Sequence, residues 1–296
     1  MAAVDINRAT TGVSLPASVS GEIWGSVVEQ SAVMQAARQI NLPGSGASID
    51  VVTGEPTAGW VTEADEKPVS RGTLSSKVMT PYTLAVIEPF SNQFRRDKNA
   101  LYNELARRLP AALSRKFDST VYGVGSVPGS NFDNLSTAPT LTVDATGTFG
   151  DAAAVLNAVA AAGYQLTGWI AAPSLHGLLI TAVDSLGRQF FTSDTNQQTV
   201  GSMFGAPVYV TRGTMPTGAG ATNDKIGFAG DWQNAAVYGT VEGIQVSISD
   251  QATLNDGGTP LNLWQRNMFA VRAEIEVGFR VRDVNAFISI NDGTAD

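Results

Sequence analysis

The amino-acid sequence predicts an α+β fold with one long helix, one long strand and an extended two-stranded loop. Apolar residues occupy every odd position from 269 to 281, which is the alternation of a strand with one buried face. Apolar side chains also recur every fourth residue from Leu101 to Val121, which predicts a helix over residues 97–122. Between residues 49 and 88, two strand-like runs lead out to an acidic turn and back.

The composition allows a large core and favours contact with partners. Of the 296 residues 43% are apolar, whereas only 16% are charged, which is below the usual quarter. A surface so poor in charge is typical of a protein that covers itself with partners. The net charge of −8 argues against a protein that grips nucleic acid. Seven of the 19 basic residues lie between Arg95 and Lys116, where we expect a solvated helix face or a surface that pairs with acidic neighbours.

The chain begins with a segment that predicts an arm. The residues MAAVDINRATTG lack the basic-then-apolar pattern of a signal peptide. They are also polar, and because a polar terminus is ordered only when something holds it, we expect them to lie on another subunit. Residues 18–40 carry apolar side chains near helical spacing, which predicts an amphipathic helix that ends before the LPGSG turn.

The extended loop carries the stretch AGWVTEADEKPVSRG at its tip. Acidic side chains at Glu63, Asp65 and Glu66 follow Trp60, and such acids can pair for hydrolysis. The flanking glycine and proline residues offer them no rigid support, which favours a loop that contacts a partner. Two strands alone are barely stable in water, so the loop is expected to need another surface beneath it.

The long helix is predicted to cross two environments. At ~1.5 Å per residue it spans roughly 40 Å, and its four-residue repeat rotates the apolar stripe by roughly 200° along its length. Pro110 falls in mid-helix, where it removes a hydrogen bond and should bend the helix. After this helix, short helices and strands alternate: TFGDAAAVLNAVAAAGY is a helix, GWIAAP a strand, and MFGAPVYVTRGTMP a strand between turns.

No pattern in the sequence predicts catalysis, a metal site or a cofactor. The chain has no cysteine, which excludes disulfides and thiolate metal sites. His176 is the only histidine; in the helix predicted around it, a surface or core role is commoner than a catalytic one. Phosphate-binding loops, nucleophile elbows and Ser-x-x-Lys motifs are missing. No run of 18 apolar residues predicts a membrane helix.

Several stretches, taken in order, resemble the major capsid protein of tailed bacteriophages, which has the Hong Kong 97-like fold. They are EIWGSVVEQSAVMQAARQINLP, GWVTEADEKPVS, LARRLPAALSRKFD, GWIAAPSLHGLLITAVDSLGR, FGAPVYVTRGTMP, FAGDWQNAAVYGTVEGIQV and NMFAVRAEIEVGFRVRDVNAFISI. The resemblance implies a structural protein that forms hexamers and pentamers in an icosahedral head shell around double-stranded DNA. It implies an N-terminal arm (1–48), an extended loop (49–88), a peripheral domain (89–140 and 262–296) with a spine helix, and an axial α/β domain (141–261).

The resemblance also implies partners and a location. The loop would lie across the adjacent subunit, with contacts from Trp60, Glu63, Asp65, Glu66, Lys67 and Arg71. Further partners would be a portal, a decoration protein and a scaffolding protein. We expect the last to be separate, because the chain opens with Met and lacks a long region before the arm. The virion would assemble in the host bacterial cytoplasm, and an acidic wall would avoid trapping the packaged DNA, which it contacts without sequence specificity. Cargo-storing encapsulins resemble the same fold and remain the alternative; a hydrolase is the alternative of another class.

Some members of this family weld their subunits by an isopeptide bond between a loop lysine and a neighbour's asparagine, assisted by a glutamate. Lys67, Asn267 and Glu274 match those places. An unbroken strand would put Asn267 and Glu274 on opposite faces, so Asn267 must precede the regular strand or sit at a bulge. Arg272 shares the face of Glu274 and offers it an ion pair. We therefore expect an ordinary interface salt bridge rather than the weld.

Overall fold

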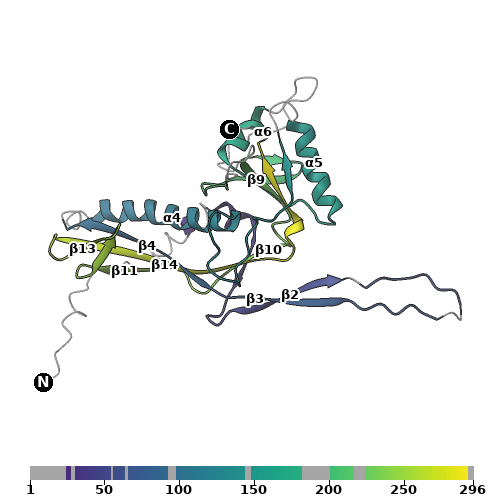
Figure 1. Ribbon diagram of the computed structural model, residues 1–296, viewed down its shortest axis with the longest axis horizontal. Helices are drawn as coiled ribbons and strands as arrows, with labels where there is room; N and C mark the ends of the chain where they lie inside the picture. Colours follow the sequence, from purple (N-terminus) through teal and green to yellow (C-terminus); the bar gives the residue numbers. More distant parts are fainter. Residues whose placement is uncertain are drawn as a thin grey trace.

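The computed structural model describes residues 25–27, 31–54, 56–63, 66–92, 98–143, 148–181, 201–216 and 224–292. Figure 1 shows three parts: a sheet with the long helix α4 (Lys98–Tyr122) lying along it, a second sheet flanked by two helices, and a hairpin that projects from the body. Among the described residues, no helix is long and apolar enough to cross a membrane.

The first sheet is built around the long strand β14. Its strands are β1 (Arg38–Asn41), β4 (Tyr82–Ser91), β10 (Ala236–Thr240), β11 (Gln245–Ser249) and β14 (Met268–Val281). Strand β4 pairs with β14 from Ser91↔Met268 to Tyr82↔Val277, while β10 and β11 share the opposite edge and β1 runs parallel to β10. Every odd residue of β14 from 269 to 281 is buried, as predicted.

Helix α4 supplies the other half of this core. The predicted helix over residues 97–122 is confirmed to within one residue, and its apolar repeat is buried at Leu109, Leu113, Phe117 and Val121. The rings of Phe117 and Phe279 meet edge to face with centroids 6.3 Å apart, which ties the helix to β14. The side chains of residues 98–107 lie outside the described ones.

The second sheet has six strands in the order β5–β15–β9–β6–β8–β7. They are β5 (Thr140–Thr142), β6 (Gly168–Ala171), β7 (Ser202–Met203), β8 (Ala206–Val210), β9 (Lys225–Gly230) and β15 (Phe287–Asn291). Helices α5 (Thr148–Ala161) and α6 (Pro173–Thr181) lie against it, and Val155, Trp169 and Ile290 fill the core between them. The expected helices and strands of this region are confirmed; the side chain of His176 lies outside the described ones.

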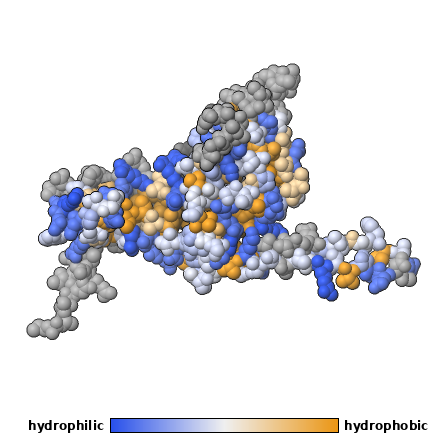
Figure 2. Space-filling view, in the orientation of Figure 1, coloured by the Kyte–Doolittle hydropathy of each residue, from blue (hydrophilic) through white to orange (hydrophobic). Residues whose placement is uncertain are grey.

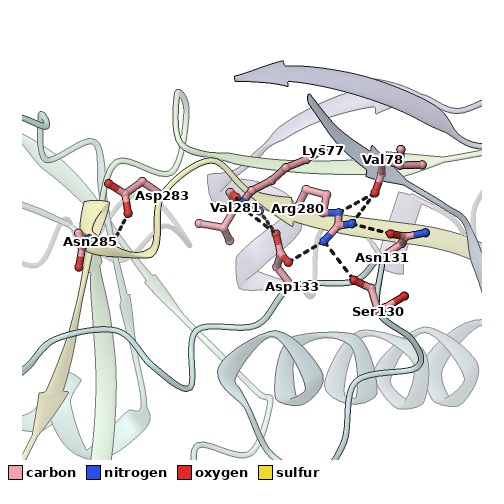
Figure 3. Close-up of polar contacts among 9 residues, drawn as sticks. All are labelled: Lys77, Val78, Ser130, Asn131, Asp133, Arg280, Val281, Asp283 and Asn285. Atoms are coloured by element: carbon pink, nitrogen blue, oxygen red, sulfur yellow. Dashed lines mark hydrogen bonds and ion pairs between the residues drawn. The ribbon is translucent and has the colours of Figure 1, made fainter. Parts of the chain in front are cut away.

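Sheet membership crosses the sequence ranges expected for the axial and peripheral domains. Strands β10 and β11, from the axial range, pair with β14, whereas β15, from the peripheral range, pairs with β9. The chain makes this exchange through a short 3₁₀ turn, Val284–Ala286, which Asp283 caps by accepting a hydrogen bond from the amide of Asn285 (Figure 3).

Two expectations about the first ninety residues are wrong. The helix predicted through residue 40 ends with α3 (Ala32–Ala36), and residues 38–41 form β1 instead, because pairing with β10 satisfies their backbone groups. The return limb of the loop is also shorter than expected. It ends with β3 (Thr73–Met79), and after Thr80 and Pro81 the chain enters the main sheet as β4.

A second, short hairpin was not predicted. Strands β12 (Thr253–Asp256) and β13 (Thr259–Asn262) pair antiparallel through a turn at Gly257 and Gly258, both with positive φ. Its apolar residues Leu254 and Leu261 pack with Leu263 and Ala270 in a small core of their own.

Candidate assembly interface

The projecting hairpin (residues 47–79) is the most exposed part of the described chain. Strand β2 (Ala47–Gly54) pairs antiparallel with β3 along its whole length. Beyond it the two limbs stay together, since the amide of Thr57 donates to Ser70 Oγ at 2.8 Å and Gly59 lies against the ring of Pro68. At ~3.3 Å per residue, the limb from Ala47 to Glu63 spans about 50 Å. The hairpin therefore extends well beyond the body (Figure 1).

The tip of the hairpin (residues 56–63 and 66–72) exposes apolar as well as charged side chains. Trp60 has a relative exposure of 105% and Val69 of 86%. The hairpin stands clear of the body in Figure 2. The predicted contact residues Glu63, Glu66, Lys67 and Arg71 are exposed as well; Asp65 lies outside the described residues. A free indole leaves a large apolar surface in water, which burial against a partner would remove.

Arg280 fixes the root of the hairpin to the body (Figure 3). Its Nε and Nη2 donate to the carbonyl oxygen of Val78 in β3, at 2.8 and 2.6 Å. Its Nη1 forms an ion pair with Asp133 Oδ1 at 2.7 Å, and its Nη2 donates to Asn131 Oδ1 at 2.8 Å. The side chain is only 11% exposed. One planar guanidinium thus links β14, β3 and the loop after α4 in a fixed geometry.

Asp133 and Lys77 complete this polar root. The second carboxylate oxygen of Asp133 accepts from the amide of Val281 at 3.0 Å and lies 3.7 Å from Lys77 Nζ. Lys77 Nζ also donates to the carbonyl oxygen of Val281 at 2.6 Å. The hairpin and the end of β14 are therefore joined by side-chain contacts in place of a shared strand ladder.

The apolar side of the root is a socket for Met79. Gly239 and Gly278 lie directly opposite each other in β10 and β14. A Cβ added to Gly278 would lie 2.7 Å from Met79 Cγ, and one added to Gly239 would overlap Leu42. Met79 and Leu42 are both buried in this space, with Val237 beside them. Two facing glycines thus allow the hairpin to rest directly on the sheet backbone.

A buried carboxylate ties the N-terminal segment to α4. Asp118 is fully buried and accepts hydrogen bonds from Ser31 Oγ, from the amide of Ala32 at 3.1 Å and from Thr211 Oγ1 at 3.1 Å. Tyr122 in turn donates to Thr211 Oγ1 at 2.9 Å. Burial raises the pKa of Asp118 to about 6, although these hydrogen bonds oppose the rise. Burial, and then the negative charge of Asp118, raise the pKa of Tyr122 as well.

Ser31 also begins helix α3, because its hydroxyl accepts a hydrogen bond from the amide of Met34 at 3.1 Å. The Asp118 cluster therefore sets where the segment before β1 lies, at the junction of α3, α4 and the loop around Thr211.

The three residues of the expected crosslink are not together within one chain. Lys67 is an exposed residue of the hairpin tip. The hairpin projects away from β14 in Figure 1. Asn267 precedes β14 with a left-handed φ of 52°, and its Oδ1 accepts from Asn92 Nδ2 at 2.8 Å. Glu274 lies seven residues further along the strand, roughly 23 Å away. It forms an ion pair with Arg272, Nε to Oε1, at 3.1 Å.

The comparisons with known proteins cover most of the chain. Residues 11–292 match the model of the phage capsid family. The chain belongs to the phage capsid family. It is 30% identical to a protein of Mycobacterium phage L5 named "Probable major capsid protein gp17", over 88% of this chain and 84% of that protein. It is therefore similar to proteins of the phage head along nearly its whole length.

Solved structures share the fold of this capsid protein. A chain from Mycobacterium phage Bobi matches with a TM-score of 0.68 and 24% identity, covering 88% of this chain and 89% of that one. A chain from the capsid of an empty GTA particle matches with a TM-score of 0.65 at 15% identity, over 90% of each chain. Its membership of the phage capsid family, together with its likeness to a named major capsid protein, makes the protein a structural component of the virion. In the part of the chain that the structure describes, no group of His, Asp and Glu could hold a metal ion.

Sequence reasoning identified the exposed tip and missed the groups that anchor the hairpin. Arg280 was visible only as one of several charged residues at even positions of the predicted strand. Asp118 follows Phe117 in the apolar helix repeat, and nothing in the sequence distinguishes it from an exposed residue; only the structure shows it buried, together with Ser114 one turn earlier.

Proposed function

We propose that the chain, a major capsid protein, builds a closed icosahedral shell of hexamers and pentamers by laying its projecting hairpin across the adjacent subunit. The observation that carries this proposal is the hairpin itself, about 50 Å long and fully exposed at Trp60. A two-stranded ribbon of this length is marginal in water unless a second surface covers it. Membership of a family of shell proteins supplies that surface as a further copy.

The proposal assigns the parts as in the Hong Kong 97-like fold. Residues 1–48 are the N-terminal arm, and the extended loop, expected over 49–88, is the projecting hairpin that ends at Met79; α4 is the spine of a peripheral domain, 80–140 and 262–296, and the axial domain is 141–261. Support comes from α4 on the β14 sheet and from α5 and α6 on the second sheet. Strands β10 and β11 of the axial range pair with β14, and β15 of the peripheral range pairs with β9. The two domains would therefore be linked by shared sheets and would not move independently.

The shell would enclose double-stranded DNA without sequence-specific contacts, in keeping with the net charge of −8. A separate scaffolding protein, a portal and a decoration protein would be its partners during assembly in the host bacterial cytoplasm. If the chain forms a phage capsid, its particles should contain DNA that is protected from nuclease. Particles of an encapsulin-like compartment would instead hold a cargo enzyme.

The contacts of the hairpin tip would be non-covalent. Trp60, Glu63, Asp65, Glu66, Lys67 and Arg71 would touch the adjacent subunit. A covalent bond between Lys67 and Asn267 of another subunit would need the carboxylate of Glu274 as proton acceptor, and Arg272 already occupies that carboxylate in an ion pair. An interface salt bridge is therefore the favoured role of Lys67.

Removing the tip tests the proposal. Residues 55–72 are replaced by Asn-Gly, which closes β2 and β3 with a two-residue turn. As a control, Gly257 and Gly258 in the β12–β13 turn are replaced by the same dipeptide. Both variants should keep the circular dichroism of the folded chain, but only the control should give closed shells in electron microscopy. Shells of ordinary size from the tipless chain would refute the proposal.

A further inference from the structure

A groove of about 430 Å³ opens between the start of β4, the second half of α4 and the loop that follows it. Its apolar wall contains three aromatic side chains, Tyr82, Phe117 and Phe132. Phe132 meets each of the other two edge to face, with centroids 6.3 Å apart. A cavity of about 150 Å³ already admits a benzene ring. This groove therefore has room for an indole together with the backbone that carries it.

Among the described residues that line the groove, the one cation is Lys116. Its side chain is exposed, as are Ser126 and Pro128 of the same lining. The groove thus offers a buried aromatic wall and a positive charge at its edge. A fitting partner would present an aromatic side chain followed closely by an acid.

The hairpin tip of the same chain has that chemistry. Trp60, at 105% relative exposure, is not covered by any of the residues that the structure describes, and Glu63 and Glu66 follow it as exposed acids. The projecting tip and the groove lie at different places on one chain, so a contact between them joins two copies head to tail. Such contacts close into rings when the copies are related by rotation. Tryptophan is also among the residues most enriched as binding anchors.

We propose that Trp60 of one subunit inserts into the groove between β4 and α4 of the adjacent subunit, where Lys116 pairs with an acid of the same tip. The inference rests on the proposed function, because it needs the hairpin to lie on a neighbouring copy. It adds the pocket that receives the tip and the side chain that anchors it. The length of the hairpin, about 50 Å, is enough to cross a body whose long helix spans about 38 Å.

Cysteine cross-linking tests the contact, because the chain contains no cysteine of its own. Val61→Cys beside the anchor is combined with Ser126→Cys at the rim, and assembled shells are treated with a short bis-maleimide. Denaturing electrophoresis should show a ladder of linked subunits, and mass spectrometry should identify the peptides that contain residues 61 and 126. The matched control pairs Val61→Cys with Thr259→Cys, an exposed residue of β13, and should stay monomeric.

Variants of the anchor give a second readout. In the same cysteine background, Trp60→Ala should abolish the ladder and raise the subunit concentration needed for assembly at least about tenfold, while Trp60→Phe should retain both. Shells without a ladder, or a link between residues 61 and 126 of one chain, would each overturn the inference and leave the proposed function standing. If the unmodified chain forms no shells, the proposed function itself fails.

Discussion

Arg280 should be worth several kcal/mol because it is the main polar bond between the hairpin and the body. Replacing it by alanine leaves the carbonyl of Val78 and one oxygen of Asp133 without their partner. Removing one member of a buried ion pair costs about 3–5 kcal/mol. Lys77 still lies 3.7 Å from Asp133, whose side chain is 25% exposed, so solvent and lysine offset part of this loss. We expect Arg280→Ala to lower the free energy of unfolding by about 3 kcal/mol.

The assay separates a local from a global effect. Guanidinium unfolding of subunits dissociated from shells measures stability, while hydrogen–deuterium exchange follows the peptide that covers β3. That peptide should lose protection in Arg280→Ala, because the guanidinium no longer holds Val78. Arg280→Lys keeps the charge and loses the planar fork, so its loss should fall near half that of alanine.

A neighbouring arginine provides the control. Arg282, two residues further along the chain, has an exposed side chain, so Arg282→Ala should cost less than about 1 kcal/mol. If Arg280→Ala costs no more than Arg282→Ala, or leaves the exchange of β3 unchanged, the guanidinium does not hold the root and the reasoning is refuted.

Three further predictions concern α4 and the tip. Burial raises the pKa of Asp118 from 3.8 to about 6, so its contribution to stability is complete below pH 4 and is lost as pH rises through 6, by up to about 3 kcal/mol. Unfolding curves measured over a pH series should show a smaller change of stability with pH in Asp118→Asn than in the unmodified chain, and equal slopes of stability against pH would contradict the assignment. Pro110→Ala should stabilise the isolated helix by up to ~3 kcal/mol yet impair assembly; shells of normal yield and shape would show that the expected bend is incidental. Shells boiled in detergent should run as a single monomer band; a covalent ladder that disappears in Lys67→Ala would establish the weld instead.

The elements that the sequence predicted well are those whose periodicity is set by one buried face. Strand β14 alternates because one face meets α4, and α4 repeats its apolar residues because it meets β14. Strand β1 lacks such a pattern: three of its four residues are exposed, and only its pairing with β10 makes it a strand. A helical spacing that continued to residue 40 was therefore misleading.

The anchors of the candidate interface depend on register, which no local pattern reveals. Gly239 and Gly278 form a socket only because β10 and β14 place them opposite each other. Ser31 and Asp118 are 87 positions apart in the sequence and meet only once α3 has docked on α4. By contrast, the tip was predictable because it depends on short-range composition: an indole and acids between glycine and proline residues.

The side chain that fills the glycine socket is a methionine, and this has a mechanical consequence. A thioether with three rotatable bonds can re-form its contacts after a small displacement, which a β-branched or aromatic residue cannot. The guanidinium of Arg280 holds Val78 by hydrogen bonds, whereas the flexible side chain of Met79 can adjust its packing in the glycine socket. The root therefore has one fixed contact and one adaptable contact. In the proposed shell, such a root would let the hairpin change its inclination without opening a void, so that one sequence would suit both the flatter curvature around six subunits and the steeper curvature around five.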